Sequence, residues 1–211
     1  MPTVSIHVVD HPLVAHKLTV LRDARTDTPT FRSLADELVT LLAYEATRNA
    51  QVEPTTVTTP VAEAAGVTFS GPRHLVVPVL RAGLGMLDAI LELIPGARVG
   101  HIGLQRDEST AIASQYYSKL PKGLASSVVL MIDPMLATGG SAVAAIDLIK
   151  AAGATAISMI CIVSAPEGLS LLERAHPDVA VYTPVVDKEL NAHKFIVPGL
   201  GDFGDRLYGT V

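Results

Sequence analysis

The stretch "MIDPMLATGGS" (residues 131–141) ends an apolar run on an acid and a proline, and then reaches a glycine pair. The residues before Asp133, "SVVLMI", are apolar and rich in β-branched side chains, and a helical pattern begins at Gly140. A buried strand, a short loop and a helix in this order are typical of α/β proteins with a parallel sheet.

The same alternation extends to both sides of this stretch. Apolar runs predict further strands at residues 75–80, 99–104, 157–164 and 179–183, and a short β-prone piece lies at 55–59. Helical spacing predicts helices at residues 30–47, 84–93, 140–152 and 167–175. Near-continuous apolarity indicates strands that are covered on both faces. We therefore expect one α/β domain over residues 1–211, with a mainly parallel sheet flanked by helices.

The composition excludes several classes of protein. Hydrophobic residues make up 49% of the chain and charged residues 18%, which is typical of a packed globular protein. The net charge of −5, with no basic run and no Trp, argues against nucleic-acid binding. No apolar run approaches the roughly 20 residues of a membrane span, and no signal peptide is visible. We expect a soluble cytoplasmic protein in which Cys161 is a small core residue.

Residues 133–141 combine two kinds of ligand chemistry. Glycines and a helix N-terminus leave backbone N–H groups free for a phosphate, and Thr138 and Ser141 add hydroxyl donors. Asp133 can accept hydrogen bonds from neighbouring hydroxyls. A sugar phosphate would satisfy both halves. Taken alone, "TGGS" is better interpreted as a helix-capping turn, and a loop-capping role is the alternative for Asp133. The lysine of a nucleoside-triphosphate P-loop is missing.

The longer stretch "VVLMIDPMLATGGS" resembles the 5-phospho-α-D-ribose 1-diphosphate (PRPP) motif of type I phosphoribosyltransferases. Most branches of that superfamily carry two adjacent acids, and Pro134 departs from this pattern. The form "DPMLATGGS" instead resembles the uracil phosphoribosyltransferase branch. Residues 11–23, 78–86, 164–169 and 198–210 agree with that branch, so the likeness covers nearly the whole chain.

The resemblance implies roles for individual residues. Catalytic roles fall to Asp133, Arg81 of "RAGLG" and Arg106. An exposed arginine followed by two turn glycines is the alternative for Arg81. The residues implied in PRPP binding are Arg81, Arg106, Asp133, Pro134, Met135, Leu136, Ala137, Thr138, Gly139, Gly140, Ser141 and Asp202.

Two further segments receive a function from the resemblance. Residues 105–126 are too long and polar for a simple turn, and the family implies a flexible hood over the diphosphate. A solvated surface hairpin is the alternative. Residues 186–211 form the implied uracil-binding segment, with contacts at Ile196, Gly201, Asp202 and Phe203. The alternative is a structural turn, with no helix following its glycines. Family members commonly carry alanine in place of Phe203, so an inward-pointing ring would alter the pocket.

The implied reaction converts uracil and PRPP to UMP and diphosphate. Mg²⁺ is expected mainly on diphosphate and ribose oxygens and water, with Asp202 as a candidate contact. The seven histidines, among them His193, show no metal-binding spacing and are expected in packing or at the surface. Two alternatives stay open: an RNA-binding pyrimidine regulator and a phosphoribosyltransferase for another base. A homo-oligomer is expected, while GTP binding is left open. The core is expected at residues 71–185, after an N-terminal extension up to about residue 70.

Overall fold

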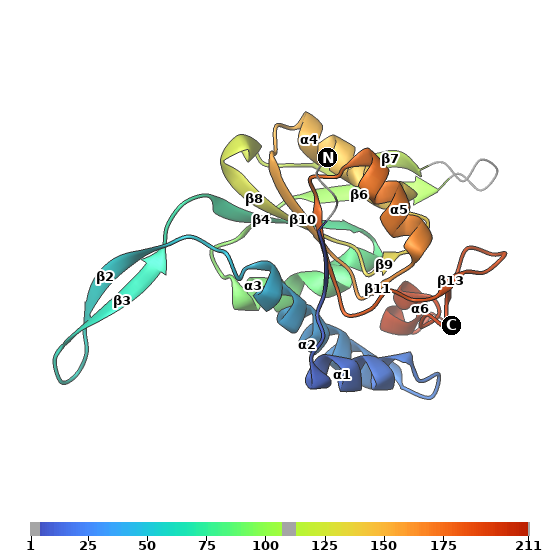
Figure 1. Ribbon diagram of the computed structural model, residues 1–211, viewed down its shortest axis with the longest axis horizontal. Coiled ribbons are helices and arrows are strands. Elements are labelled where there is room, and N and C mark those ends of the chain that lie inside the picture. Colours follow the sequence, from blue (N-terminus) through green and yellow to red (C-terminus); the bar gives the residue numbers. More distant parts are fainter. Residues whose placement is uncertain (1–4, 107–112, 211) are drawn as a thin grey trace.

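The computed structural model describes residues 5–106 and 113–210, and a large sheet lies between two layers of helices (Figure 1). The strand order is β1-β12-β10-β8-β4-β6-β7, with β5 paired to β4. Among the described strands of this sheet, only β6 and β7 pair antiparallel, so the predicted mainly parallel sheet is confirmed. The strands are β1 (Ile6–Val8), β4 (Arg73–Leu80), β5 (Arg98–Val99), β6 (His101–Arg106), β7 (Ala113–Lys119), β8 (Ser127–Ile132), β10 (Ala156–Ile160) and β12 (Ala180–Thr183).

Helices cover both faces of the sheet, which explains the continuous apolarity of the strands. One face carries α1 (Pro12–Arg22), α2 (Thr28–Ala46) and α3 (Leu87–Leu93), and the other carries α4 (Gly140–Ala151) and α5 (Pro166–Ala175) (Figure 1). Leu130 and Ile132 of β8 pack in the same cluster as Phe31 of α2. Val129 and Met131 lie in the second cluster, with residues of α4. Alternate residues of one strand therefore enter two separate cores.

The N-terminal part contributes to the sheet and also carries an arm. The expected helix at residues 30–47 is α2, which is capped by Asp27 through a 2.9 Å hydrogen bond from the Thr30 amide. The prediction did not include β1 and α1. Strand β2 (Val52–Thr58) overlaps the β-prone piece expected at 55–59, whereas β3 (Glu63–Phe69) was not predicted. The two strands form an antiparallel hairpin that projects away from the sheet (Figure 1). The sequence of β3 contains "AAG", which has weak strand propensity.

The predicted strand at residues 157–164 is divided in two. The Cys161 amide donates to the Tyr182 carbonyl at 3.0 Å, and the Ile162 amide donates to the Pro134 carbonyl at 2.9 Å. The chain therefore leaves the large sheet after β10 and forms β11 (Val163–Ser164), which pairs in parallel with β9 (Met135–Leu136). Cys161 is buried in the core as expected, and burial raises the pKa of its thiol to about 12.

The C-terminal segment contains a helix that the sequence analysis did not expect. The segment holds β13 (Glu189–Leu190), β14 (Ile196–Val197) and α6 (Phe203–Tyr208). Asp202 caps α6 by accepting a 2.9 Å hydrogen bond from the Asp205 amide. The expectation that no helix follows the glycines was wrong, because this aspartate starts a helix within the glycine-rich stretch. Two short 3₁₀ helices occupy Ala82–Met86 and Leu124–Ser126. Within the described ranges, no helix is long and apolar enough to cross a membrane.

Candidate active site

Two of the three loops predicted to carry chemistry, those after β4 and β8, lie along one edge of the sheet, and the third follows β6 at residues 107–112, outside the described part. In the register of β4 with β8, Pro78 is opposite Ile132, and in that of β4 with β6, Val79 is opposite Ile102. The carboxyl ends of these parallel strands therefore meet. Ligands of open α/β sheets bind outside such strand ends, and the predicted convergence is confirmed for the loops after β4 and β8. Of the expected loop at residues 105–126, residues 105–106 belong to β6 and residues 113–119 form β7.

The expected phosphate cradle lies where the loop after β8 enters α4. Gly139 has a φ of 85°, and a Cβ there would lie 2.8 Å from the Gly168 carbonyl oxygen. The conformation and the close approach of the start of α5 both require glycine. The helix begins at Gly140, and its first N–H groups have no partners within the helix. These groups and the helix dipole suit a phosphate.

The other residues of this loop have different exposures. Leu136 is 1% exposed, and its carbonyl accepts a 2.9 Å hydrogen bond from the Ala165 amide. Pro134 is buried, and its carbonyl accepts from the amides of Ile162 and Val163. Both residues are buried, and the hydrogen bonds to their carbonyl groups hold the shape of the loop. Met135 and Ala137 are half-buried and line a pocket. The sequence assigned all four positions to PRPP binding without this distinction.

Asp133 is a half-buried carboxyl group in the same pocket. Burial raises its pKa from 3.8 to about 7, while a hydrogen bond from the Met135 backbone acts in the opposite direction. It forms no ion pair with any described residue. A carboxyl group with this pKa can change its charge near neutral pH and can accept hydrogen bonds from ligand hydroxyls when ionised.

The loop after β4 presents Arg81 to solvent beside a tightly packed glycine. Arg81 is exposed and follows a cis peptide bond at Leu80–Arg81. Gly83 is buried, and a Cβ there would lie 2.6 Å from the Ile132 carbonyl oxygen. The loop thus rests against the strand that carries Asp133. This packing holds the Arg81 backbone beside residues 133–141, which we call the donor loop. A guanidinium here matches the geometry of phosphate oxygens.

A large open pocket lies beside Arg81. Its volume is about 730 Å³, and it extends from the ends of β4 and β6 to α6 and the C-terminal residues. Its walls combine a cation with hydroxyl and carboxylate groups, which suits a charged and hydrated ligand. The pocket is lined by Leu80, Arg81, Ala82, Leu104, Gln105, Tyr116, Asp202, Gly204, Asp205, Tyr208 and Thr210.

A smaller pocket of about 280 Å³ adjoins the first one and joins the two predicted half-sites. From the donor loop it is lined by Asp133, Met135 and Ala137. From residues 186–211, which we call the base segment, it is lined by all four residues predicted to bind uracil. The complete lining is Ala82, Asp133, Met135, Ala137, His193, Lys194, Phe195, Ile196, Gly201, Asp202, Phe203 and Gly204. Ala82, Asp202 and Gly204 border both pockets. Asp202 therefore stands where the two pockets meet.

The ring of Phe203 points into the protein core. Its side chain is 1% exposed, and its ring lies 5.2 Å from that of Phe31, centroid to centroid. Phe203, which replaces the alanine common in family members, thus adds apolar packing to the core beneath the base segment. His193, Lys194 and Phe195 also line the smaller pocket, although the sequence did not predict it and His193 was expected in packing or at the surface. Their position directly before Ile196, a predicted uracil contact, could have indicated that they lie at the pocket.

Two predictions concern groups that the structure does not describe fully. The backbone of Arg106 ends β6, but its side chain and residues 107–112 lie outside the described part, so its contacts stay a prediction. Among the described residues, no cluster of three His, Cys, Asp or Glu side chains suits a metal ion. Asp202 is exposed at the junction of the pockets. A single carboxylate beside substrate phosphates is a common arrangement for Mg²⁺, so the site fits that ion.

Comparison with known proteins gives a consistent result. A family model described as "Uracil phosphoribosyltransferase" matches residues 8–210. A uracil phosphoribosyltransferase from Kineococcus radiotolerans is 56% identical over 209 residues, covering 98% of this chain and 99% of the relative. One from Streptomyces avermitilis is 57% identical over 207 residues, covering 97% and 98%.

Solved structures extend the comparison to the fold. A structure titled AQ2163 protein from Aquifex aeolicus superposes with a TM-score of 0.89 at 36% identity, over 96% of this chain and 97% of that one. The orotate phosphoribosyltransferase of Mycobacterium tuberculosis, solved with PRPP, has a TM-score of 0.50 at 14% identity, over 84% and 93%. This second likeness concerns the fold alone. On the family match and the identities above, the chain belongs to the uracil phosphoribosyltransferase family.

Proposed function

We propose that this protein transfers the phosphoribosyl group of PRPP to uracil, giving UMP and diphosphate. The observation that carries the proposal is the pocket in which Asp133 of the donor loop faces the base segment around Gly201. This pocket borders the larger one beside Arg81 at Asp202, which lines both. We propose that a flat base, a ribose and a diphosphate lie in sequence across the two pockets.

The proposed role of the donor loop is to hold the ribose phosphate. The 5-phosphate would lie on the N–H groups of residues 138–141, where the dipole of α4 favours negative charge. The ribose hydroxyls would donate hydrogen bonds to the ionised Asp133. Binding would therefore lower the pKa of this carboxyl group from its raised value of about 7.

The proposed chemistry requires positioning more than a strong nucleophile. The bond from ribose C1 to the diphosphate oxygen breaks, and its electron pair leaves with the diphosphate. Uracil N1 forms the new bond to C1 and gives up its proton to solvent water. The developing positive charge at the ribose is stabilised by the carboxylate of Asp133. Arg81 and Arg106 would neutralise the departing diphosphate. Magnesium, when bound through Asp202 and substrate oxygens, would add charge neutralisation.

The base segment is proposed to read uracil through its main chain. Gly201 has a φ of 83° and is exposed, so no side chain covers the backbone next to Asp202. Backbone N–H and C=O groups can match the carbonyls and N–H of uracil. The packing of Phe203 in the core keeps its ring away from the base.

We also propose a homo-oligomer, and the support is the β2–β3 arm. Val61 is 95% exposed, Phe69 67% and Val67 66%, so the arm leaves apolar surface in water. Such surface is typical of protein contacts. Light scattering of the purified protein tests this proposal, since a monodisperse monomer contradicts it. The cytoplasmic location stays a prediction of the sequence, and GTP binding stays open.

A base-panel assay tests the main proposal. The protein is incubated with PRPP, Mg²⁺ and one base at a time, and release of diphosphate is followed. We expect turnover with uracil and none above background with cytosine or hypoxanthine. Turnover confined to another base would move the assignment to that base. No turnover with any base would reject the transferase.

A further inference from the structure

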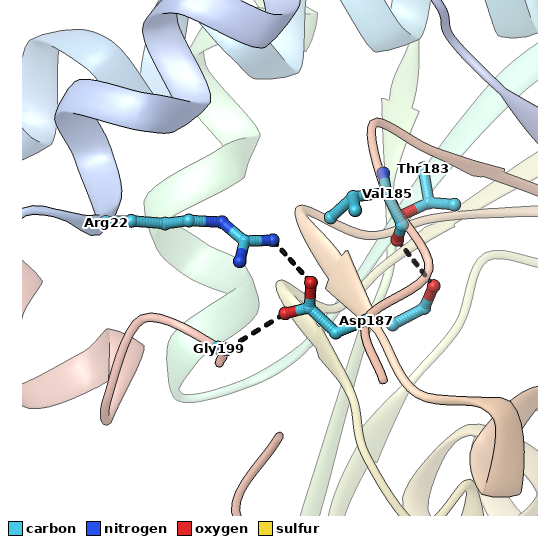
Figure 2. Close-up of polar contacts among 6 residues, drawn as sticks. Arg22, Thr183, Val185, Asp187 and Gly199 are labelled. Atoms are coloured by element: carbon cyan, nitrogen blue, oxygen red, sulfur yellow. Dashed lines mark hydrogen bonds and ion pairs between the residues drawn. The ribbon is translucent and has the colours of Figure 1, made fainter. Parts of the chain in front are cut away.

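The buried carboxylate of Asp187 links the two halves of the site, although it lines neither pocket. Figure 2 shows this carboxylate between Arg22 of α1 and the backbone of Gly199. Arg22 Nη2 lies 2.7 Å from Asp187 Oδ1, and the Gly199 amide donates to Asp187 Oδ2 at 2.9 Å. Asp187 is 6% exposed. One side chain thus holds the turn that precedes the base-reading residues.

The backbone of Asp187 is tied to the donor loop. Its amide donates to the Ser164 carbonyl at 2.8 Å, and the Ser164 hydroxyl donates to the Val185 carbonyl at 2.8 Å. Ser164 belongs to β11, whose partner β9 is part of the donor loop, with Ser164 opposite Leu136. A continuous path of hydrogen bonds therefore runs from the donor loop through Asp187 to Gly199.

A second contact anchors the base segment on its other side. Arg206 donates through Nη1 to the Leu200 carbonyl at 2.9 Å and through Nη2 to the Asp23 carbonyl at 2.7 Å. Asp23 directly follows Arg22, so the end of α1 is connected to both Gly199 and Leu200. The main chain that leads into Gly201 is held from both sides.

The Arg22–Asp187 pair is poorly suited to a role in stability alone. The Arg22 side chain is 20% exposed and the Asp187 side chain 4%, so both charges are largely removed from water. The buried Arg22 Nε has no hydrogen-bond partner among the described residues. Buried ion pairs often stabilise no better than apolar residues of similar size, although they can fix one geometry.

We propose that Asp187, held by Arg22, is a positioning residue that sets the base segment in register with the donor loop. Phosphoribosyl transfer needs the attacking nitrogen of the base in line with ribose C1, and small displacements reduce the rate strongly. The inference rests on the proposed function. It adds that the affinity for the base depends on an ion pair outside the pocket that binds it.

The test compares Asp187→Asn with the control variant Asp178→Asn. The control breaks the ion pair between Lys150 and Asp178 on the far side of the sheet, whose N–O distance of 2.7 Å equals that of the Arg22–Asp187 pair. We expect Asp187→Asn to raise the KM for uracil by about tenfold and to change the KM for PRPP by less than about twofold. Asp178→Asn should change neither value. A purely structural role would lower the active fraction and hence kcat, while both KM values stayed constant.

Two further measurements separate positioning from unfolding. Arg22→Met should raise the KM for uracil, and Arg22→Lys should raise it less, because lysine retains a cation near Asp187. Hydrogen exchange of the peptide containing Gly199 should accelerate in Asp187→Asn, while peptides of α4 keep their protection. An unchanged uracil KM in Asp187→Asn, or an equal rise in both KM values, would overturn the positioning role. Absence of uracil turnover in the wild type would instead overturn the proposed function.

Discussion

The carbonyl oxygen of Ile132 lies 2.6 Å from the position that a Cβ on Gly83 would occupy. The loop that carries Arg81 is therefore pressed against the strand that carries Asp133. Because the obstructing atom is backbone, a side chain at residue 83 can be accommodated only if the loop or the strand moves. The distance between Arg81, the proposed diphosphate contact, and Asp133, the proposed ribose contact, depends on this approach.

We expect Gly83→Ala to lower kcat/KM by about a hundredfold, because a displacement near 1 Å at a reacting centre can have that effect. Gly96→Ala is the matched control, since nothing lies within 4 Å of the corresponding Cβ position. Steady-state kinetics and thermal unfolding of both variants provide the measurement. A Gly83→Ala enzyme with wild-type kcat/KM would show that the loop does not need this close packing.

The raised pKa of Asp133 predicts a pH dependence of stability. Burial moves this pKa from 3.8 to about 7, so the folded state binds more protons than the unfolded state between these values. Stability should therefore fall as pH rises from about 4 to 7. The loss is at most about 4 kcal/mol and less with solvent screening, since one pKa unit corresponds to about 1.4 kcal/mol.

Asp133→Asn removes this titration and the carboxylate. Its free energy of unfolding, relative to wild type, should rise between about pH 4 and 7, while kcat/KM falls tenfold or more. Urea unfolding at several pH values tests the predicted change in the free energy of unfolding, and kinetics at pH 8 test the predicted fall in kcat/KM. Wild-type kinetics in this variant would remove Asp133 from the mechanism, and a parallel stability profile would contradict the raised pKa.

The base preference is expected to be independent of the Phe203 ring. Phe203→Ala should lower the free energy of unfolding by about 3 kcal/mol, because it removes a buried ring packed on Phe31. Uracil should still be used and cytosine rejected, since its amino group would mispair buried polar groups. Turnover of uracil and cytosine is compared at a temperature where the variant stays folded. Gain of cytosine turnover would show that the ring shapes the pocket.

The architecture could be predicted from sequence because it depends on patterns over many residues. Buried strands such as β8 are apolar from residue 128 to residue 132, and α4 begins where the glycines predict it. Motif residues of the donor loop and base segment also converge in one pocket, as the resemblance implied.

Features that depend on single long-range contacts were missed. The division of residues 157–164 depends on a hydrogen bond between Ile162 and Pro134, which no local pattern indicates. The Arg22–Asp187 pair joins residues 165 positions apart. The orientation of Phe203 was open because it depends on Phe31, in a different helix.

Arg81 and Arg106 are expected to act on the diphosphate. Replacing either with alanine should weaken PRPP binding more than UMP binding, because UMP lacks the diphosphate. The loss for Arg81→Ala should be at least as large, since its loop is fixed by the packing of Gly83. Calorimetric titration with each ligand in the presence of Mg²⁺ measures both effects. Arg48→Ala, at a surface arginine that pairs with Glu45, is the control. Equal losses for both ligands would contradict the assignment.

The last prediction concerns residues 105–126, which the sequence assigns to a hood over the diphosphate. An oxocarbenium-like ribose is easily hydrolysed, so the reaction benefits when this segment excludes water. We expect PRPP with Mg²⁺ to slow tryptic cleavage after Arg106 and Lys119, whereas UMP slows it less. Cleavage after Arg25, an exposed residue in the α1–α2 connection, should be unaffected by either ligand. Arg106→Ala should also raise the share of PRPP lost to hydrolysis. Equal cleavage of the segment with and without PRPP would favour the alternative of a surface hairpin.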